Sequence, residues 1–416
     1  MRGLLHFAHL WIGIVLGAYF ALLGLTGSTL VFKSEIERAL APDLYKVATP
    51  TSATPTTRFP LDTLIADFQR NHAGVTNFSI QLPQSLDDSM IINYIPATPP
   101  DWHGRVINPY SPVAPPVAQG RHDRHELFID PYTGKALGEH LVGGTFFYVV
   151  HNLHAHLLLE DIGYTFHTYA VLFLLVLVAS GLWLWWPSVG HFRKQFKART
   201  RIKFGASIKR IVVDLHNTIG FYVFVVLFSI VTTATLHLWP GPARWLFLSV
   251  NDKLHDSLRA IPATSTITAQ RGQAFSTLPY SRAVELARSV EPSRVPVRVD
   301  IDSGITTVML GSLPDHLVSP RLTSVSLRAT GPATIQVQSP ASVPLDSRID
   351  SWIMFVHYGQ WGPGGAFYFI KAIWLIAGLS PTVLFVSGCT MYLNKHAARR
   401  KAERSRSRRP VEDRLV

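Results

Sequence analysis

Four long apolar stretches, separated by segments of mixed character, dominate the pattern of hydrophobic and polar positions. A helix needs about 20 mostly apolar residues to cross the hydrocarbon core of a bilayer. Four segments meet this requirement: 10–32, 168–186, 211–239 and 372–393, the last preceded by an amphipathic stretch at 352–371. The first segment is longer than the apolar part of a signal peptide, so we expect a retained helix. The pattern predicts four transmembrane helices.

The two long segments between these helices show the patterns of soluble structure. In the first, residues 60–70 have apolar positions at helical spacing, and short alternating runs follow at 77–82, 90–95 and 126–130. In the second, a helical pattern at 279–290 precedes alternating runs at 295–301, 306–310, 322–329 and 334–337. Each segment therefore predicts a separate α+β unit inserted between two membrane helices.

These patterns divide the chain into eight parts. We expect a first transmembrane helix in 1–33, a soluble domain in 34–145, an interfacial segment and second helix in 146–187, a basic loop in 188–210, a third helix in 211–239, a second soluble domain in 240–350, an interfacial segment and fourth helix in 351–394, and a basic tail in 395–416.

Composition and charge support a membrane protein and orient it. Hydrophobic residues make up 47% of the 416 residues and charged residues only 16%, yet the net charge is +12. This composition excludes a disordered chain and a simple cytosolic enzyme, and the single Cys389 excludes a disulfide scaffold. The 187–210 loop holds eight basic residues and no acid, and the tail from Lys395 holds nine basic residues and three acids. By the positive-inside rule both termini face the cytoplasm, and both inserts are extracytoplasmic. Juxtamembrane charge explains the basic tail, so we expect no nucleic-acid binding.

The first and third helices repeat one pattern. His9 and Gly13 match His216 and Gly220, and a threonine follows each histidine by 17 residues, at Thr26 and Thr233. The second and fourth helices each carry a Ser-Gly pair, at 180–181 and 387–388. We expect two helix–insert–helix repeats related by an axis along the membrane normal.

Histidines occur near the ends of every predicted span, where polar groups often indicate function. The orientation places His9 and His216 near the cytoplasmic face. The other layer, near the opposite face, contains His151, His154, His156, His167, His237 and His357. Two layers that each draw histidines from two helices match the needs of two stacked haems with two axial histidines each. The alternative is that each histidine is an interfacial residue bonded to a carbonyl or water. The glycines of the first helix, among them Gly13 and Gly17, suit either a flat macrocycle or plain helix packing.

A further pair, His122 and His125, lies before the strand at 126–130. It could bind a metal or an anionic substrate, but we expect it to be a solvated part of the loop.

Several motifs together resemble those of the PepSY-associated transmembrane family over nearly the whole chain. They are His9-Leu-Trp-Ile-Gly13, Leu25-Thr-Gly27, Leu153-His154, Gly181-Leu-Trp-Leu-Trp-Trp-Pro187, Asp214-Leu-His216 and His357-x-Gly359, and residues 127–137 resemble the closing strand and turn of a PepSY domain. The resemblance implies an α-helical membrane protein with four transmembrane helices in two helix–insert–helix repeats and two extracytoplasmic α+β (PepSY-like) inserts.

The family includes haem b ferric-siderophore reductases of the bacterial inner membrane. The resemblance thus implies two haem b groups that carry electrons to a periplasmic ferric siderophore, which then releases Fe(II). His9 and His216 match the ligands of the inner haem. His154 and His357 match those of the outer one, with His151 as an alternate and His167 and His237 as lower-ranked substitutes. No flavin or nicotinamide motif is evident, so we expect quinol or a cytoplasmic reductase as the electron donor.

Three other functions remain open at this point. A PepSY-type regulatory or binding module would use the membrane helices only as anchors and would carry no haem. A metal or siderophore transporter is disfavoured because the spans lack paired Gly/Pro breaks and buried acids. A cytochrome that reduces another acceptor, such as copper or a respiratory partner, is the third.

Overall fold

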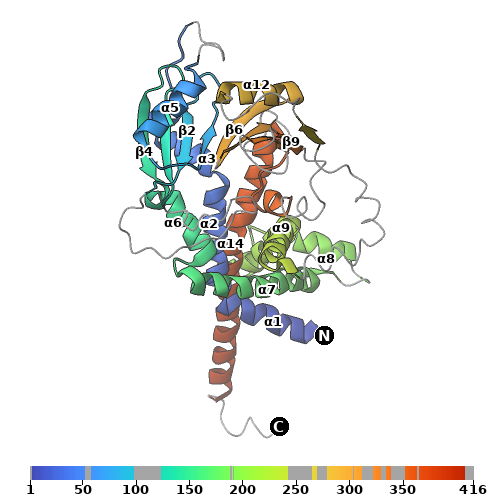
Figure 1. Ribbon diagram of the computed structural model, residues 1–416. Helices are drawn as coiled ribbons and strands as arrows, with labels where there is room; N and C mark the ends of the chain where they lie inside the picture. Colours follow the sequence, from blue (N-terminus) through green and yellow to red (C-terminus); the bar gives the residue numbers. More distant parts are fainter. Residues whose placement is uncertain are drawn as a thin grey trace.

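The computed structural model describes residues 2–51, 58–97, 123–187, 190, 192–241, 265–268, 279–302, 304–311, 322–328, 334–338, 352–362 and 365–407. A group of long apolar helices carries a single β-sheet at one end (Figure 1). Helix α1 and the C-terminal end of α14 lie on the side away from the sheet. The two sides are called sheet-proximal and sheet-distal below.

Three helices in the described part of the chain are individually long and apolar enough to cross a membrane: α7 (Glu160–Trp185), α9 (Ile208–Leu238) and α14 (Gly365–Ser407). A fourth span exists if α1 (Arg2–Val15) and α2 (Gly17–Val31), which bend by 64° at Leu16, are counted as one. The apolar segment 10–32 therefore lies in two helices, α1 and α2, rather than in one continuous helix, and the pair makes the predicted first span when it is counted as one. Gly17, the first residue of α2, lets α14 approach closely, because a Cβ there would lie 2.3 Å from the ring of Phe385.

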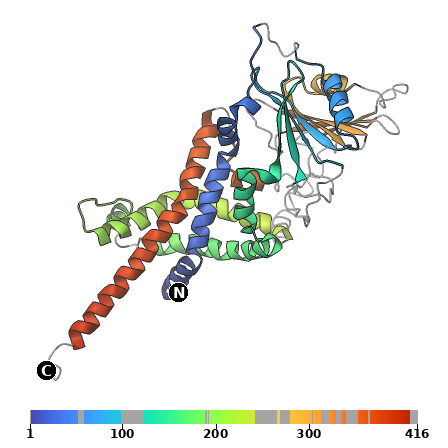
Figure 2. The same ribbon diagram turned by 90° about the vertical axis from the view of Figure 1, so that its left-hand side faces the viewer.

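The helices pack as two neighbouring pairs, α2 with α14 and α7 with α9, and Figure 2 shows the second pair lying across the first. The α2–α14 contact is a backbone contact, since a Cβ on Gly24 would stand 2.1 Å from the carbonyl oxygen of Gly378. Ser28 donates a hydrogen bond to the carbonyl of Leu375 at the same crossing. The pair α7–α9 is held by the apolar side chains of Val171, Val223, Leu227 and Val231. The short helix α8 (Phe192–Arg199) packs against α9.

The sequence predicted a separate domain from each insert, but the two inserts form one structure. Their strands join in one antiparallel sheet of the order β4-β3-β2-β1-β6-β7-β8-β9-β5. The strands are β1 (Phe78–Gln81), β2 (Met90–Tyr94), β3 (His125–Ile129), β4 (Ala136–Leu141), β5 (Ser265–Thr268), β6 (Val295–Asp302), β7 (Ile305–Gly311), β8 (Thr323–Arg328) and β9 (Thr334–Gln338). The join is the pairing of β1 with β6, which satisfies two strand edges that separate domains would leave open.

One hydrophobic core serves both inserts. Helices α5 (Leu61–Asn71) and α12 (Tyr280–Val290) cover the same face of the sheet, as Figure 1 shows. Ile65 from α5 and Ala287 from α12 are fully buried there, together with Ile80 and Val299 from the two joining strands. Asp62 of α5 also accepts a hydrogen bond from the backbone of Tyr280 at the start of α12. The α+β character of each insert agrees with the prediction, but their independence does not.

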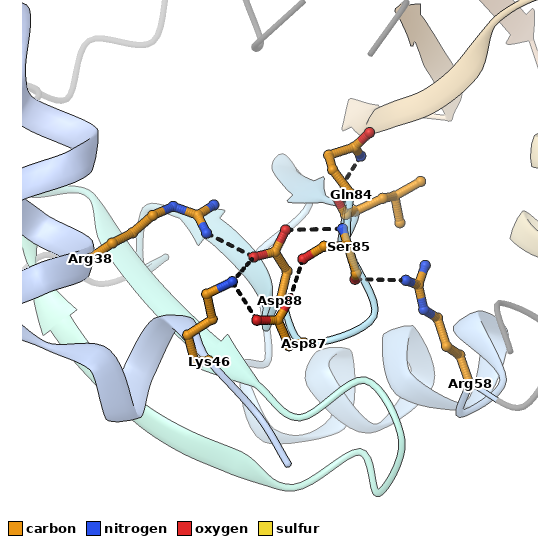
Figure 3. A network of polar contacts seen from close by, with 8 residues as sticks. Arg38, Lys46, Arg58, Gln84, Ser85, Asp87 and Asp88 are labelled. Carbon is orange, nitrogen blue, oxygen red and sulfur yellow. Dashed lines mark hydrogen bonds and ion pairs between the residues drawn. The ribbon is translucent and has the colours of Figure 1, made fainter. Parts of the chain in front are cut away.

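Helices α3 (Lys33–Leu40) and α4 (Pro42–Tyr45) connect the membrane helices to the sheet. Glu35 of α3 accepts a hydrogen bond of 2.5 Å from Lys371 of α14, whose side chain is almost fully buried. One turn later, Arg38 donates to Asp88 at 2.7 Å, and Lys46, which follows α4, bonds both Asp87 and Asp88 (Figure 3). Ion pairs of α3 and of Lys46 thus attach the sheet to the helices.

Helix α6 (Phe146–His156) returns the chain from β4 to the membrane helices through a short 3₁₀ turn, Val142–Gly144. It ends in a tight turn in which Leu157, Leu158 and Glu160 all have positive φ. Gly163 is required at the start of α7, since a Cβ there would stand 1.6 Å from the carbonyl oxygen of His156. This turn fixes α6, with its histidines, against α7.

Candidate functional site

The sheet-distal site is built around His9 of α1 and His216 of α9. Their ring centroids are 6.5 Å apart, and the ring planes are inclined at 85°. Both rings line a cavity of about 380 Å³. This volume falls within the range of about 300–1,000 Å³ that is usual for ligand sites. The predicted pair therefore meets at one cavity, although the two residues are more than 200 positions apart in sequence.

Each of these two rings is held by a serine of the neighbouring helix. His9 Nδ1 is 3.1 Å from both Ser180 Oγ and the Leu177 carbonyl oxygen, and His216 Nδ1 is 2.9 Å from Ser387 Oγ. Both serine hydroxyls donate their own proton to a carbonyl of their helix. The Leu177 carbonyl can only accept, so His9 Nδ1 carries the proton and Nε2 keeps its lone pair. His216 has the same tautomer when the Ser387 proton stays on the carbonyl of its own helix.

A glycine follows each of these serines and faces the histidine ring. A Cβ on Gly181 would stand only 3.2 Å from His9 Cε1, so this glycine makes room for the ring, whereas a Cβ on Gly388 would stand 3.6 Å from His216 Cε1, an ordinary contact. His9 and Ser180 are 171 residues apart, as are His216 and Ser387. The histidine–serine–glycine arrangement therefore occurs twice, once in each half of the chain.

The sheet-proximal site brings together three predicted histidines. His154 of α6 has Nδ1 at 2.9 Å from Thr26 Oγ1, and the Thr26 hydroxyl donates to the carbonyl of Leu22. His357, in the helical turn at 352–357, has Nδ1 at 3.1 Å from the Ile230 carbonyl oxygen and 3.3 Å from Thr233 Oγ1. The Ile230 carbonyl can only accept, so Nε2 of His357 is unprotonated. Nε2 of His154 is unprotonated when the Thr26 proton stays on the Leu22 carbonyl.

His167 of α7 is the third member of the sheet-proximal site. Its ring centroid is 6.3 Å from that of His154, at an inclination of 52°. Its Nδ1 is 2.5 Å from the hydroxyl of Tyr19. The sequence ranked His167 below His357, but the structure brings both into this site.

The other predicted histidines have different surroundings. His151 is partly buried one turn before His154 on α6, and His237 is partly buried at the last turn of α9. His156 is buried and stacks on Tyr164 with ring centroids 5.6 Å apart. His122 lies outside the described residues. His125 begins β3 rather than lying in a loop, and its Nδ1 is 2.7 Å from Glu139.

The glycines of the first span serve both purposes that the sequence left open. Gly17 and Gly24 face α14 and allow close helix packing, Gly13 and Gly17 line the cavity, and Gly27 faces a histidine ring. A Cβ on Gly27 would lie 3.1 Å from Cε1 of His154.

A haem can be tested against the sheet-distal site by its spacing. Two imidazoles on opposite sides of one metal ion, each bonded at roughly 2.1 Å and with about 1.1 Å from nitrogen to ring centre, have centroids about 6.4 Å apart. The observed 6.5 Å between His9 and His216 agrees with this value. Among the described residues no group of three or more His, Cys, Asp or Glu could hold a metal ion. Paired histidines of this kind suit a metal that brings its own equatorial ligands, as haem iron does.

Several residues of these sites were not identified as functional from the sequence. Ser180, Ser387, Thr26 and Thr233 were noticed only as repeated positions, yet all four hydroxyls face a histidine Nδ1. Their spacing from the histidines was the available signal. Nothing in the sequence distinguished Tyr19, because its partner His167 lies on another helix.

Comparison with known proteins places the chain in one family. The family model of the PepSY-associated TM region matches residues 7–395. No curated protein matches the chain. The match covers α2, α7 and α9, most of α1 and α14, both histidine sites and the described strands. The chain therefore belongs to the PepSY-associated transmembrane family and is a multi-pass membrane protein.

Proposed function

We propose that this protein is an electron-transfer protein of the bacterial inner membrane that binds two haem b groups and reduces ferric siderophores on the periplasmic side. The observation that carries the proposal is the state of four histidines. His9, His216, His154 and His357 each have Nδ1 beside a hydroxyl or carbonyl acceptor, which leaves Nε2 free to bind iron. Histidines that ligate metals usually donate their other ring N–H in this way.

His9 and His216 would hold one haem in the sheet-distal site. His154 would hold the second, with His357 as its partner by analogy with the repeat and His167 as the alternative by distance. A bound haem supplies a reversible one-electron couple. The chain contributes neutral imidazoles in fixed orientations and an apolar surrounding that limits the access of water.

The arrangement of the helices supports transfer across the membrane. Helix α7 contributes His167 to the sheet-proximal site and Ser180 to the sheet-distal site. Helix α9, which runs the opposite way, contributes Ile230 to the sheet-proximal site and His216 to the sheet-distal site. The same two helices therefore join the sites. The basic residues in the last turns of α14 lie on the side away from the sheet. The positive-inside rule then assigns the sheet to the periplasm and both termini to the cytoplasm.

The reaction is balanced by an external donor. A quinol that is oxidised to quinone delivers two electrons and releases two protons, and two ferric siderophores each accept one electron. A cytoplasmic reductase that delivers single electrons would serve equally. The siderophore binds Fe(II) more weakly than Fe(III), so the metal is released.

The test is a stopped-flow reaction of the reduced, purified protein with ferric siderophores of the hydroxamate and catecholate types. We expect oxidation of the protein, with Fe(II) trapped by ferrozine in equal amount to the electrons lost. The His154→Ala variant should stay reduced in the same mixture, because its sheet-proximal site is incomplete. Equal rates for the variant and the wild type, or no Fe(II) with any ferric chelate, would contradict the proposal.

A further inference from the structure

Helix α14 continues well past the sheet-distal site. Its Ser387 lies beside His216 Nδ1, and its Tyr392 lines the same cavity. The helix then runs on to Ser407 and projects past α1, away from the sheet (Figure 1 and Figure 2). The side chains of residues 397–403 are all exposed. This part of α14 therefore stands free of the other described elements.

The free end of α14 is strongly basic. Residues 395–403, called the basic helix end below, hold one acid, Glu403, and four cations: Lys395, Arg399, Arg400 and Lys401. An α-helix turns by about 100° per residue, so these cations point to several sides of the helix and leave no face of large apolar side chains. Such a helix gains nothing by packing on a hydrophobic surface. The partner that suits it is anionic.

The headgroups of anionic lipids reach only the first of these charges. The headgroup layer adds roughly 5–8 Å to each side of the hydrocarbon core. Leu393 is the last large apolar residue of α14. At about 1.5 Å per residue, Lys395 lies roughly 3 Å beyond Leu393 along the helix, and Arg399 to Lys401 lie roughly 9–12 Å beyond it. The last three cations therefore lie outside the headgroup layer, where an acidic protein surface can contact them.

The basic helix end is continuous with the sheet-distal site. Lys395 lines the cavity that also contains His9 and His216. His396 packs on Tyr392, another residue of that lining, with ring centroids 4.3 Å apart. A protein docked on the basic helix end would thus lie next to the histidine pair that the proposed function assigns to one haem.

We infer that the basic helix end is the docking surface for an acidic one-electron carrier protein of the cytoplasm, which delivers electrons to the sheet-distal haem. This inference rests on the proposed function, and it narrows the electron donor from quinol or protein to protein. In each transfer the carrier loses one electron and ferric haem iron gains it, so no bond forms or breaks. One reduced carrier is oxidised for each ferric siderophore that is reduced.

The first test measures binding without electron transfer. The probe is an oxidised, acidic [2Fe–2S] ferredoxin, titrated by calorimetry into the full-length protein in nanodiscs of neutral phosphatidylcholine. We expect binding that weakens steeply as salt is added, because the contact is between exposed charges. The triple variant Arg399→Gln, Arg400→Gln, Lys401→Gln should bind about tenfold more weakly, since each exposed charge contributes modestly.

Helix α8 provides a matched control. The triple variant Arg193→Gln, Lys194→Gln, Lys197→Gln removes the same number of exposed cations from another part of the chain. It should bind ferredoxin as tightly as the wild type. Equal weakening by both triple variants would show an effect of total charge and would overturn the inference.

The second test follows electrons into the haem-loaded protein. Reduced ferredoxin is mixed with the oxidised protein under anaerobic conditions, and haem reduction is followed by absorbance in a stopped-flow instrument. At low ferredoxin concentration the rate should fall about tenfold in the basic-end variant and stay unchanged in the α8 variant. Duroquinol, a small neutral donor, should act on all three proteins equally, because it needs no anionic docking surface.

Two further outcomes would overturn the inference by naming another occupant. Ferredoxin binding that disappears when phosphatidylglycerol is added to the nanodiscs would show that lipid headgroups occupy the basic helix end. Tighter binding of a short RNA than of ferredoxin would show a nucleic-acid site.

The outcomes separate the inference from the proposed function. If the protein binds two haems and reduces ferric siderophores with duroquinol as donor, but ferredoxin neither binds nor reduces it, the inference is wrong and the proposed function stands. If the protein binds no haem, the proposed function is wrong, and the inference falls with it as a route for electrons whatever the calorimetry shows.

Discussion

His9 and His216 lie face to edge across one cavity, with ring centroids 6.5 Å apart, and each is bonded through Nδ1 to a serine that follows it by 171 residues. The two hydrogen bonds join residues at equivalent positions in the two halves of the chain. Their common effect is to hold each ring in one orientation and one tautomer. The first prediction follows from the serine that holds His216.

Replacing Ser387 by alanine removes the hydroxyl acceptor of His216 Nδ1. Loss of such an outer partner usually weakens metal binding by about 10–100-fold, so haem affinity at one site should fall by at least about tenfold. The measurement is a competition of the bound haem with apomyoglobin. The control is Ser229→Ala, a partly buried serine on α9 whose hydroxyl donates to the Val225 carbonyl of its own helix. Equal haem loss in both variants would count against the assignment.

The close contact of α2 with α14 predicts a steric effect. A Cβ on Gly24 would stand 2.1 Å from the carbonyl oxygen of Gly378, whereas a Cβ on Gly13 would stand 3.7 Å from Leu177, an ordinary contact. Gly24→Ala should therefore destabilise the protein by about 1–3 kcal/mol, the usual effect of overpacking. Gly13→Ala should have little effect. Thermal unfolding in detergent distinguishes the two, and similar unfolding temperatures would contradict the packing described here.

The buried ion pair between Lys371 and Glu35 predicts a non-additive effect. Lys371→Met leaves Glu35 without its cation, and since Glu35 is about one-third exposed we expect a loss of roughly 1–3 kcal/mol. Adding Glu35→Gln should recover most of this loss. Unfolding of the two single variants and the double variant gives the coupling. Additive losses would show that the two side chains do not interact.

The network at Asp88 predicts how stability depends on pH. Burial alone would raise the pKa of Asp88, but the hydrogen bond and the positive charge of Arg38 outweigh it and lower the pKa to about 2. A carboxyl group with a lowered pKa stabilises the fold at pH values above its unfolded pKa of about 3.9, and the stabilisation is lost as the pH falls toward 2. The contribution at neutral pH is about 2 kcal/mol.

Asp88→Asn should therefore be less stable than the wild type at pH 7, and the difference should shrink between pH 4 and about pH 2. Denaturant unfolding, monitored by tryptophan fluorescence at several pH values, measures the difference in unfolding free energy between the variant and the wild type. Asp67→Asn is the matched control, because Asp67 is exposed and pairs only with its helical neighbour Arg70. A constant difference between Asp88→Asn and the wild type over this range would contradict the account.

The sequence predicted those features that depend on local pattern. Helical runs such as α9 and the helix–strand order of each insert follow from hydrophobic spacing, and the pairing of His9 with His216 follows from a repeated motif. The bend at Leu16 and the joining of β1 with β6 could not be predicted in this way. The bend falls within a continuous apolar run whose spacing does not mark it, and the partner of β1 lies more than 200 residues later in the chain.

The sheet-proximal site shows the same limit at the level of single residues. His154 and His357 occupy matching places in the two halves, and their threonines follow the repeat. His167 has no histidine counterpart in the second half, so the repeat gave no reason to favour it. Its position beside His154 results from the turn between α6 and α7, which depends on Gly163 and on three residues with positive φ.

The most direct test of the central claim is the absorption spectrum of the purified protein, oxidised and then reduced with dithionite, with the haem quantified as its pyridine complex. The account predicts a Soret band, sharp α and β bands on reduction, and about two haems b per chain, falling to about one in His216→Ala. A colourless protein from haem-replete cells that also fails to take up added haemin would contradict it and would favour a membrane-anchored regulatory protein without redox activity.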